Sequence, residues 1–340
     1  SWEDLLVLKP CASALIEQHD LIALDLDGVV YIGRNAVDHA VSALAAATGS
    51  GVRLAYLTNN AARPPGVVAE HLRSLGIAAT DEDVVNSAQA AARLLSRDFE
   101  PGSAIYLIGG SGLVEALGEH GLRAVTTEAD APVAVVQGYG PDMPWRQVVL
   151  GAVLVRSGLP WVATNTDMTI PIAAGIGPGN GTLVDLISRF AERSPVVAGK
   201  PEPALFDETM IRTGAERPLM VGDRLDTDIS GAVRAGWPSL LVMTGVTGVA
   251  ELVAAPPSSR PTFISGDLRG LMRRQDVPQP SGSGFTLGGW TSAVDDAGHL
   301  AVTGEGTVDD WWRCVAVAGW QHLDDTGRPA CTDGLVAVDS

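Results

Sequence analysis

Two aspartates, Asp25 and Asp27, follow the apolar run Leu21–Ala23 and precede Gly28. In a strand, residues i and i+2 point to the same side, so this spacing directs both carboxylates toward one pocket. Adjacent carboxylates repel each other unless they share a cation or a proton. Mg²⁺, a hard ion that prefers oxygen ligands, relieves that repulsion and suits phosphate chemistry. The pattern predicts a metal-assisted phosphate site, and its plain structural alternative is a turn with solvated aspartates.

A second polar group, Thr58-Asn59-Asn60, ends the apolar run Val52–Leu57. A hydroxyl, amides and free backbone N–H groups at a strand end are good donors to phosphate oxygens. Alone, such a tripeptide is usually only a turn. Its position after a buried strand favours phosphate binding. We also expect Gly28, where the backbone turns out of the sheet, to bind phosphate.

Lys200 stands between Gly199 and Pro201 and is one of only two lysines in the chain, with Lys9. A lysine at a strand end can neutralise the charge of a nucleophile and a phosphate as a point cation. A solvated surface lysine is the alternative, which this residue alone does not exclude.

Gly222-Asp223 ends the run Leu219–Val221, and Asp228 follows five residues later. Asp223 is well placed as a metal ligand, with Asp228 as a second ligand or as a residue that orients the ligands. An acidic helix N-terminus, which the helix dipole favours, is the alternative.

These groups depend on a sheet that brings strand ends together. From residue 21 to about 275, short apolar runs alternate with amphipathic stretches, which is typical of βαβ units and a doubly wound α/β fold. Ligands bind at the carboxyl ends of such strands, where all four motifs are expected. We predict a catalytic core at 1–83 and 179–275, an inserted α/β domain at 84–178 with a glycine-rich turn at Gly175–Gly179, a linker at 276–284 and a separate small ββαβ module at 285–340.

Composition limits the partners. The formal net charge of −17 repels nucleic acid and anionic lipid at long range. No long uncharged apolar run predicts a membrane span, and the acidic N-terminus lacks the basic region of a signal peptide. Three scattered cysteines show no metal or disulfide pattern. A cytoplasmic protein that acts on a small molecule is expected, and the sequence is compatible with a homo-oligomer.

The four motifs, in this order, resemble those of the haloacid dehalogenase-like (HAD) superfamily, over residues 10 to about 275. The large insertion resembles its class with an α/β cap, which includes NagD-type, p-nitrophenyl, pyridoxal and phosphoglycolate or glycerol-phosphate phosphatases. The resemblance implies a Rossmann-like core, a cap that selects the substrate, and bound Mg²⁺. It also implies that Asp25 is the nucleophile and Asp27 the acid/base, which gives its backbone carbonyl to the metal. Thr58 and Asn59 would bind phosphate, Lys200 would stabilise charge and Asp223 would bind the metal.

The whole chain also resembles actinobacterial members linked to glycerol 3-phosphate dephosphorylation. This likeness favours glycerol 3-phosphate over 2-phosphoglycolate, pyridoxal phosphate, sugar phosphates or nucleotides. Asn165 and Asp167 lie in the stretch that faces the substrate cleft in this class. The alternative is that they are ordinary polar residues of a loop.

The tail resembles part of an acetyltransferase (GNAT) fold but lacks its pyrophosphate loop. Its stripe of Trp311, Trp312, Val315 and Trp320 indicates a packed core.

Two other classes of protein fit the whole chain less well. A receiver-type signalling domain is far shorter than this chain. A scaffold without activity would be expected to lose a motif, and none is lost here.

Overall fold

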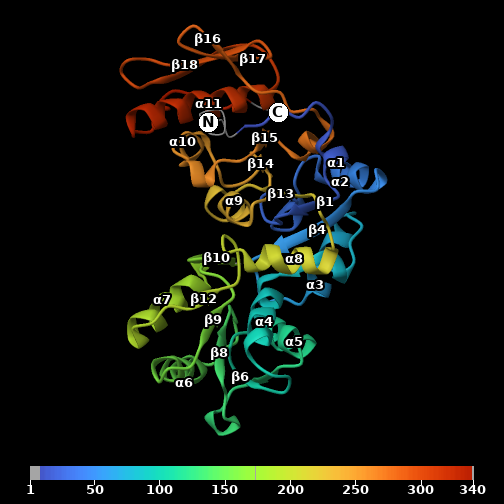
Figure 1. The fold of residues 1–340 in the computed structure, drawn as a ribbon, viewed down its shortest axis with the longest axis vertical. Helices are drawn as coiled ribbons and strands as arrows, with labels where there is room; N and C mark the ends of the chain where they lie inside the picture. Colours follow the sequence, from blue (N-terminus) through green and yellow to red (C-terminus); the bar gives the residue numbers. More distant parts are fainter. Residues whose placement is uncertain (1–7, 173, 339–340) are drawn as a thin grey trace. The chain divides into compact units, whose positions relative to one another are not determined.

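The structure, a computed structural model, describes residues 8–172 and 174–338 (Figure 1). Residues 1–7 of the predicted core and 339–340 of the predicted module lie outside the described residues. The chain forms two compact units, one made of residues 1–55, 75–77 and 215–340 and the other of residues 56–74 and 78–214. Each unit is described by itself.

The first unit is built on a parallel sheet with the strand order β15-β14-β13-β1. Strand β4 is next in this order, and only its first residues belong to the first unit. Its strands are almost wholly apolar and buried, as expected of parallel strands covered on both faces. Short helices connect them. The elements are α1 (Leu15–Gln18), β1 (Leu21–Leu24), β2 (Tyr31–Ile32), β3 (Asn35–Ala36), α2 (Ala40–Gly49), β4 (Arg53–Thr58), β13 (Pro218–Gly222), α9 (Ser230–Ala235), β14 (Ser239–Val242), α10 (Val249–Val253) and β15 (Phe263–Ser265).

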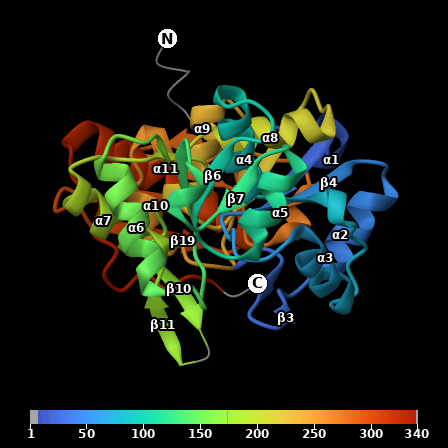
Figure 2. The same cartoon turned by 90° about the horizontal axis from the view of Figure 1, so that it is seen from below.

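The second unit contains the end of β4, paired in parallel with β5, and a five-stranded sheet in the order β12-β9-β8-β6-β7. Hairpin β10–β11 extends from this unit (Figure 2). The elements are α3 (Pro65–Ser74), β5 (Val84–Asn86), α4 (Ser87–Asp98), β6 (Ala104–Ile108), α5 (Ser111–Glu119), β7 (Arg123–Val125), β8 (Ala134–Gln137), α6 (Trp145–Arg156), β9 (Trp161–Ala163), β10 (Thr169–Ile172), β11 (Gly175–Pro178), α7 (Asn180–Ala191), β12 (Val196–Val197) and α8 (Ala204–Thr213).

The C-terminal segment adds an antiparallel sheet and one long helix to the first unit. Strands β16 (Gln279–Ser281), β17 (Gly284–Leu287), β18 (Trp290–Val294) and β19 (Leu300–Gly304) lie in sequence order, and α11 (Val308–Thr326) packs along them (Figure 1). Trp311, Trp312, Val315 and Trp320 are buried in one cluster with Leu252, Val253 and Ile264 of the α/β core. The predicted packing role of the aromatic stripe is therefore confirmed.

The α/β fold with parallel sheets and a C-terminal α+β segment agrees with the sequence prediction. Three local expectations differ from the structure. The Gly175–Gly179 stretch forms strand β11 rather than a turn, and residues 279–281 of the predicted linker pair with β17. The last strand of the predicted ββαβ module, expected at Leu335–Val338, is not a strand. Each outcome depends on whether a neighbouring strand is present to pair with, which local composition does not report. The predicted domain boundaries stay a prediction.

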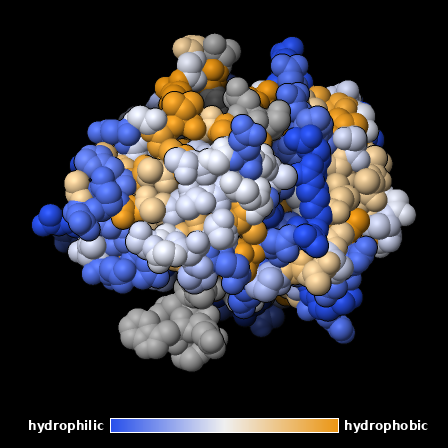
Figure 3. All heavy atoms as spheres, turned by 90° about the horizontal axis from the view of Figure 1, so that it is seen from above, coloured by the Kyte–Doolittle hydropathy of each residue, from blue (hydrophilic) through white to orange (hydrophobic). Residues whose placement is uncertain are grey.

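The outer surface is mixed in character. On the face shown in Figure 3, hydrophilic side chains predominate and hydrophobic ones lie among them. Among the described helices, none is both long enough and apolar enough to cross a membrane.

Candidate active site

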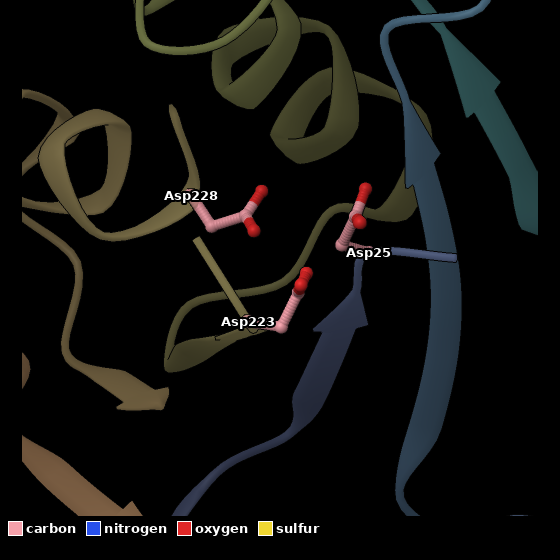
Figure 4. A group of neighbouring side chains, drawn as sticks. All are labelled: Asp25, Asp223 and Asp228. Carbon is pink, nitrogen blue, oxygen red and sulfur yellow. The ribbon is translucent and has the colours of Figure 1, made fainter. Parts of the chain in front are cut away.

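Three carboxylates of the first unit converge: those of Asp25, Asp223 and Asp228. One oxygen atom of each lies within 4.8 Å of one oxygen atom of each of the others. Figure 4 shows them directed into a shared space, Asp25 from just beyond β1 and the other two from the chain after β13. Asp223 and Asp228 are fully buried and Asp25 is partly buried.

Parallel pairing places Asp25 and Asp223 together. Strands β1 and β13 pair from Leu21 with Pro218 to Leu24 with Val221, so both strands reach the same edge of the sheet. The backbone N–H of Asp25 extends this ladder and donates to the carbonyl of Val221 at 2.8 Å. The apolar runs that form the strands therefore also set the spacing of the two carboxylates.

A loop after β14 holds Asp223. The backbone N–H of Val246 donates to Oδ2 of Asp223 at 2.7 Å, and the Thr247 hydroxyl donates to the Asp223 carbonyl at 2.6 Å. The Thr244 hydroxyl donates to the carbonyl of Gly28 at 2.6 Å. Gly28 has φ of +85°, and a Cβ there would lie 2.6 Å from Oδ2 of Asp223, so this turn requires glycine for conformation and for space.

Asp228 lies in a single π-helical turn, Leu225–Ile229. Its Oδ2 accepts from the backbone N–H of Arg224 at 3.1 Å. A Cβ at Gly222 would overlap the Asp228 side chain, so glycine lets the end of β13 approach this carboxylate. Isolated π turns frequently occur at functional sites, and this one turns Asp228 back toward the strand end.

These donors fit a hard divalent cation. Two fully buried carboxylates and a third within 4.8 Å repel each other strongly when ionised. Oxygen-only ligands are what Mg²⁺ prefers, and it commonly keeps waters in its remaining positions. Asp25, Asp223 and Asp228 could hold such an ion.

Asp27 lies in the turn that follows β1. Strand β1 ends at Leu24, so Asp25 and Asp27 lie beyond the strand, and its alternation does not govern them. The Leu26 carbonyl accepts from the N–H groups of Val30 and Tyr31, which folds the chain into a tight turn. Asp27 is exposed, and its carboxylate is not in the three-carboxylate group.

In the second unit, Asn59 joins several predicted site residues. Its Oδ1 accepts from the backbone N–H of Lys200 at 2.8 Å, and its Nδ2 donates to the Lys200 carbonyl at 3.0 Å and to Oδ1 of Asp167 at 3.3 Å. Asn165 donates through Nδ2 to the Asn59 carbonyl at 2.7 Å. The Asn59 amide therefore ties its own loop to the backbone of Lys200.

Thr58 and Asn60 make hydrogen bonds within the loop that contains Asn59. The Thr58 hydroxyl accepts from the N–H of Asn60 at 3.1 Å, and the Asn60 side chain accepts from the N–H of Ala62 at 3.0 Å. Lys200 is buried, and its Nζ donates to the Leu57 carbonyl at 3.4 Å. Thr58, Asn59, Asn60, Asn165, Asp167 and Lys200 thus form one hydrogen-bonded network within the second unit.

Two groups of supporting residues were not predicted. In the second unit, the Ser87 hydroxyl donates to the Asn59 carbonyl at 2.6 Å, and Asn180 donates to the Asn165 carbonyl at 2.7 Å. In the first unit, the missed group is the Thr244–Thr247 loop. That loop follows the apolar run Leu240–Met243, so the rule that identified the other motifs, polar residues after a buried strand, could have found it.

Two family models match the chain: haloacid dehalogenase-like hydrolase at residues 22–123 and HAD-hydrolase-like at residues 197–271. With the similarities below, they show that the chain belongs to the haloacid dehalogenase-like hydrolase family. It is 41% identical over 321 residues to the D-glycerol 3-phosphate phosphatase of Mycobacterium tuberculosis, covering 91% of this chain and 88% of that protein.

Two further comparisons agree. The crystal structure of a glycerol phosphate phosphatase from M. tuberculosis in complex with magnesium matches with a TM-score of 0.83 and 40% identity, covering 94% of each chain. The acid sugar phosphatase of Staphylococcus aureus is 34% identical over 239 residues, which is 70% of this chain and 91% of that protein. The predicted superfamily is therefore confirmed.

Proposed function

We propose that this chain is a Mg²⁺-dependent phosphatase that hydrolyses glycerol 3-phosphate to glycerol and phosphate through an aspartyl-phosphate. The convergence of Asp25, Asp223 and Asp228 is the observation that carries the proposal. The similarity to a D-glycerol 3-phosphate phosphatase over nearly the whole chain supports the choice of substrate.

In the first step, a carboxylate oxygen of Asp25 attacks phosphorus in line with the leaving glycerol oxygen. The bond from phosphorus to that oxygen breaks, and Asp27 gives it a proton. The exposure of Asp27 outside the buried carboxylate group is compatible with access to a leaving group. A well-placed acid or base contributes about 10²–10⁴-fold to such a step.

In the second step, Asp27 takes a proton from water, and the water oxygen attacks phosphorus. The bond between phosphorus and Asp25 breaks, which releases phosphate and restores the carboxylate. Mg²⁺, when held by Asp25, Asp223 and Asp228 and by the Asp27 carbonyl, would supply positive charge beside the phosphoryl oxygens.

The second-unit network supports phosphate binding in our proposal. The Thr58 hydroxyl and the N–H groups of the 58–60 loop, with Gly28, would donate to phosphate oxygens. Asn59 would act mainly through Lys200, since its amide groups already bond to the Lys200 backbone. Lys200 would then offset negative charge on nucleophile and phosphate.

The inserted domain, at 84–178, is proposed as the cap that selects the substrate, with Asn165 and Asp167 at its edge. Their bonds to Asn59 support a role in coupling substrate selection to the phosphate loop. A small phosphorylated metabolite is the proposed partner, without nucleic acid or membrane. A cytoplasmic location, and a homo-oligomer as a compatible state, belong to the same proposal.

Phosphate release from glycerol 3-phosphate, 2-phosphoglycolate and pyridoxal phosphate, each with Mg²⁺ and with EDTA, tests the function. We expect the highest kcat/KM for glycerol 3-phosphate and loss of turnover in EDTA, restored by added Mg²⁺. A preference for another of these esters would overturn the substrate but keep the phosphatase. Turnover that is unaffected by EDTA would overturn the role of the metal.

A further inference from the structure

Hydrogen bonds fasten helix α11 to the α/β core of the first unit, and two anchors stand near its two ends, with Arg313 bonded to Ile264 between them. Near its end, Asp324 makes a bidentate ion pair with the buried Arg260, at 2.7 and 2.6 Å, and the Trp320 indole donates to the Leu252 carbonyl at 2.7 Å. In its first turn, Asp309 reaches the end of strand β15. The two anchors meet different parts of the core.

Asp309 is buried and fully engaged. Its Oδ1 accepts from the Ser265 hydroxyl at 2.9 Å and from the backbone N–H of Gly266 at 2.7 Å, and its Oδ2 accepts from Nη1 of Arg273 at 3.0 Å. Charge-assisted bonds of this kind are stronger than neutral ones. Asp309 therefore fixes the position of the peptide that follows β15.

The same peptide fixes the loop that holds Asp223. The N–H of Met243 is shared between the carbonyls of Ser265 and Gly266, at 3.2 Å each. From Met243 the chain runs through Thr244, bonded to Gly28, to Val246 and Thr247, bonded to Asp223. Hydrogen bonds and the short chain segment Met243–Thr247 thus connect the C-terminal helix to a carboxylate of the three-carboxylate group.

This path is tightly packed. A Cβ on Gly245 would overlap the Asp223 carboxylate, and one on Gly270 would overlap the Ser265 side chain. Asp223 and Ser265 are both fully buried. Because close-packed interiors transmit displacements rather than absorb them, a shift at Ser265–Gly266 moves the donors of Asp223.

We propose that Asp309 is a positioning residue for the metal site: through Ser265–Gly266 and Met243 it sets the loop that orients Asp223. The C-terminal segment is then a working part of the hydrolase rather than an appended module. This inference rests on the proposed function, because it takes Asp223 as a Mg²⁺ ligand.

A purely structural role for α11 makes a different prediction. In that case, loss of either anchor would weaken folding and leave the metal site unchanged. Asp324→Ala is the matched control, because it removes a carboxylate of the same helix whose partner, Arg260, bonds to Ala255 rather than to the Asp223 loop.

The test is isothermal titration of Mg²⁺ into the metal-free full chain, with thermal unfolding in EDTA measured alongside. We expect both Asp309→Ala and Asp324→Ala to lower Tm, while only Asp309→Ala raises the Kd for Mg²⁺, about fivefold to tenfold. Asp309→Asn keeps an acceptor for Ser265 and Gly266, so its Kd should stay within about twofold of wild type.

Ser265→Ala removes one donor to Asp309 and provides a milder variant if Asp309→Ala does not fold. It should raise the Kd about twofold to threefold. Unchanged Mg²⁺ affinity in Asp309→Ala, or in Ser265→Ala if only that variant folds, overturns this inference and leaves the proposed function intact. Equal weakening by Asp324→Ala overturns it too. A wild-type chain that binds no Mg²⁺ overturns the proposed function itself.

Discussion

Each unit buries carboxylates, and the two groups differ in the charges that lie beside them. In the second unit, Glu208 on α8 is fully buried and pairs with Arg93 of α4 and with Arg212, one turn further along α8, at 2.6 Å. In the first unit, Asp223 and Asp228 are also fully buried, but a third carboxylate, Asp25, joins them. The Glu208 group joins one carboxylate to two arginines, while the other group brings three carboxylates together.

The difference separates a structural site from a chemical one. A buried carboxylate with two guanidinium partners holds helices together and needs nothing from outside. Three converging carboxylates repel each other when they are ionised, and carboxylate oxygens are the ligands that a hard external cation prefers. A convergence of like charges is thus a better indicator of function than burial alone.

The largest expected effect is on Asp25. Asp25→Asn removes the proposed nucleophile with almost no change in shape, and turnover should fall at least about 10⁴-fold. Phosphate release under saturating Mg²⁺ measures it. Asp226→Asn, a neighbouring exposed aspartate paired with Arg224, is the control and should retain full activity. A fully active Asp25→Asn enzyme would refute the covalent mechanism.

Asp223→Asn should separate metal binding from stability. We expect Mg²⁺ affinity to fall more than about 100-fold, since a direct ligand is lost. In EDTA, Tm should stay the same or rise, because one of three like charges is removed while Val246 keeps an acceptor. Added Mg²⁺ should stabilise the wild type but not the variant. A lower Tm in EDTA would contradict the view that this cluster is repulsive.

Glu208→Gln should show the reverse pattern. It leaves Arg93 and Arg212 without their shared anion, so the free energy of unfolding should fall by about 3 kcal/mol. Urea unfolding measures this, and Mg²⁺ affinity should be unchanged. The control is Glu119→Gln, which breaks a more exposed pair with Arg212 and should cost about 0–1 kcal/mol. Equal costs for the two variants would remove the contrast between buried and exposed pairs.

The chemistry of the first unit could be predicted because it follows strand ends. Apolar runs located β1 and β13, and the polar residues after them, Asp25 and Asp223, are the ones that converge. Asp27 was harder to place. Strand β1 ends at Leu24 and a turn begins at Leu26, so the alternation of side chains along a strand does not predict where Asp27 points.

Contacts between distant segments were not predictable from local patterns. Nothing in the sequence of the tail predicted that α11 shares one apolar cluster with Leu252, Val253 and Ile264, or that Asp309 binds at Ser265. Periodicity shows that a helix has an apolar face and does not show what covers it. The pairing of Glu208 with Arg93 is likewise a contact across 115 residues of sequence.

The smallest expected effect concerns His120, which lies beside the Glu208 cluster. Burial, followed by the positive charge of Arg93, lowers its pKa, with Arg212 acting in the same direction and Glu208 and Glu119 opposing. Among the described residues, none hydrogen-bonds to its buried Nε2. The folded state thus favours neutral imidazole.

The sign of the resulting pH dependence follows from that shift. Above about pH 6.5, the ordinary pKa of histidine, His120 is neutral in both states and has no pH-dependent effect. Below it, the unfolded chain takes up the proton first, so stability is lost as pH falls toward the lower folded pKa. Urea unfolding of wild type and His120→Gln at pH 7.5 and pH 5.5 tests this. The wild type should lose more stability than the variant, and equal losses would mean that the folded state does not lower the pKa of His120.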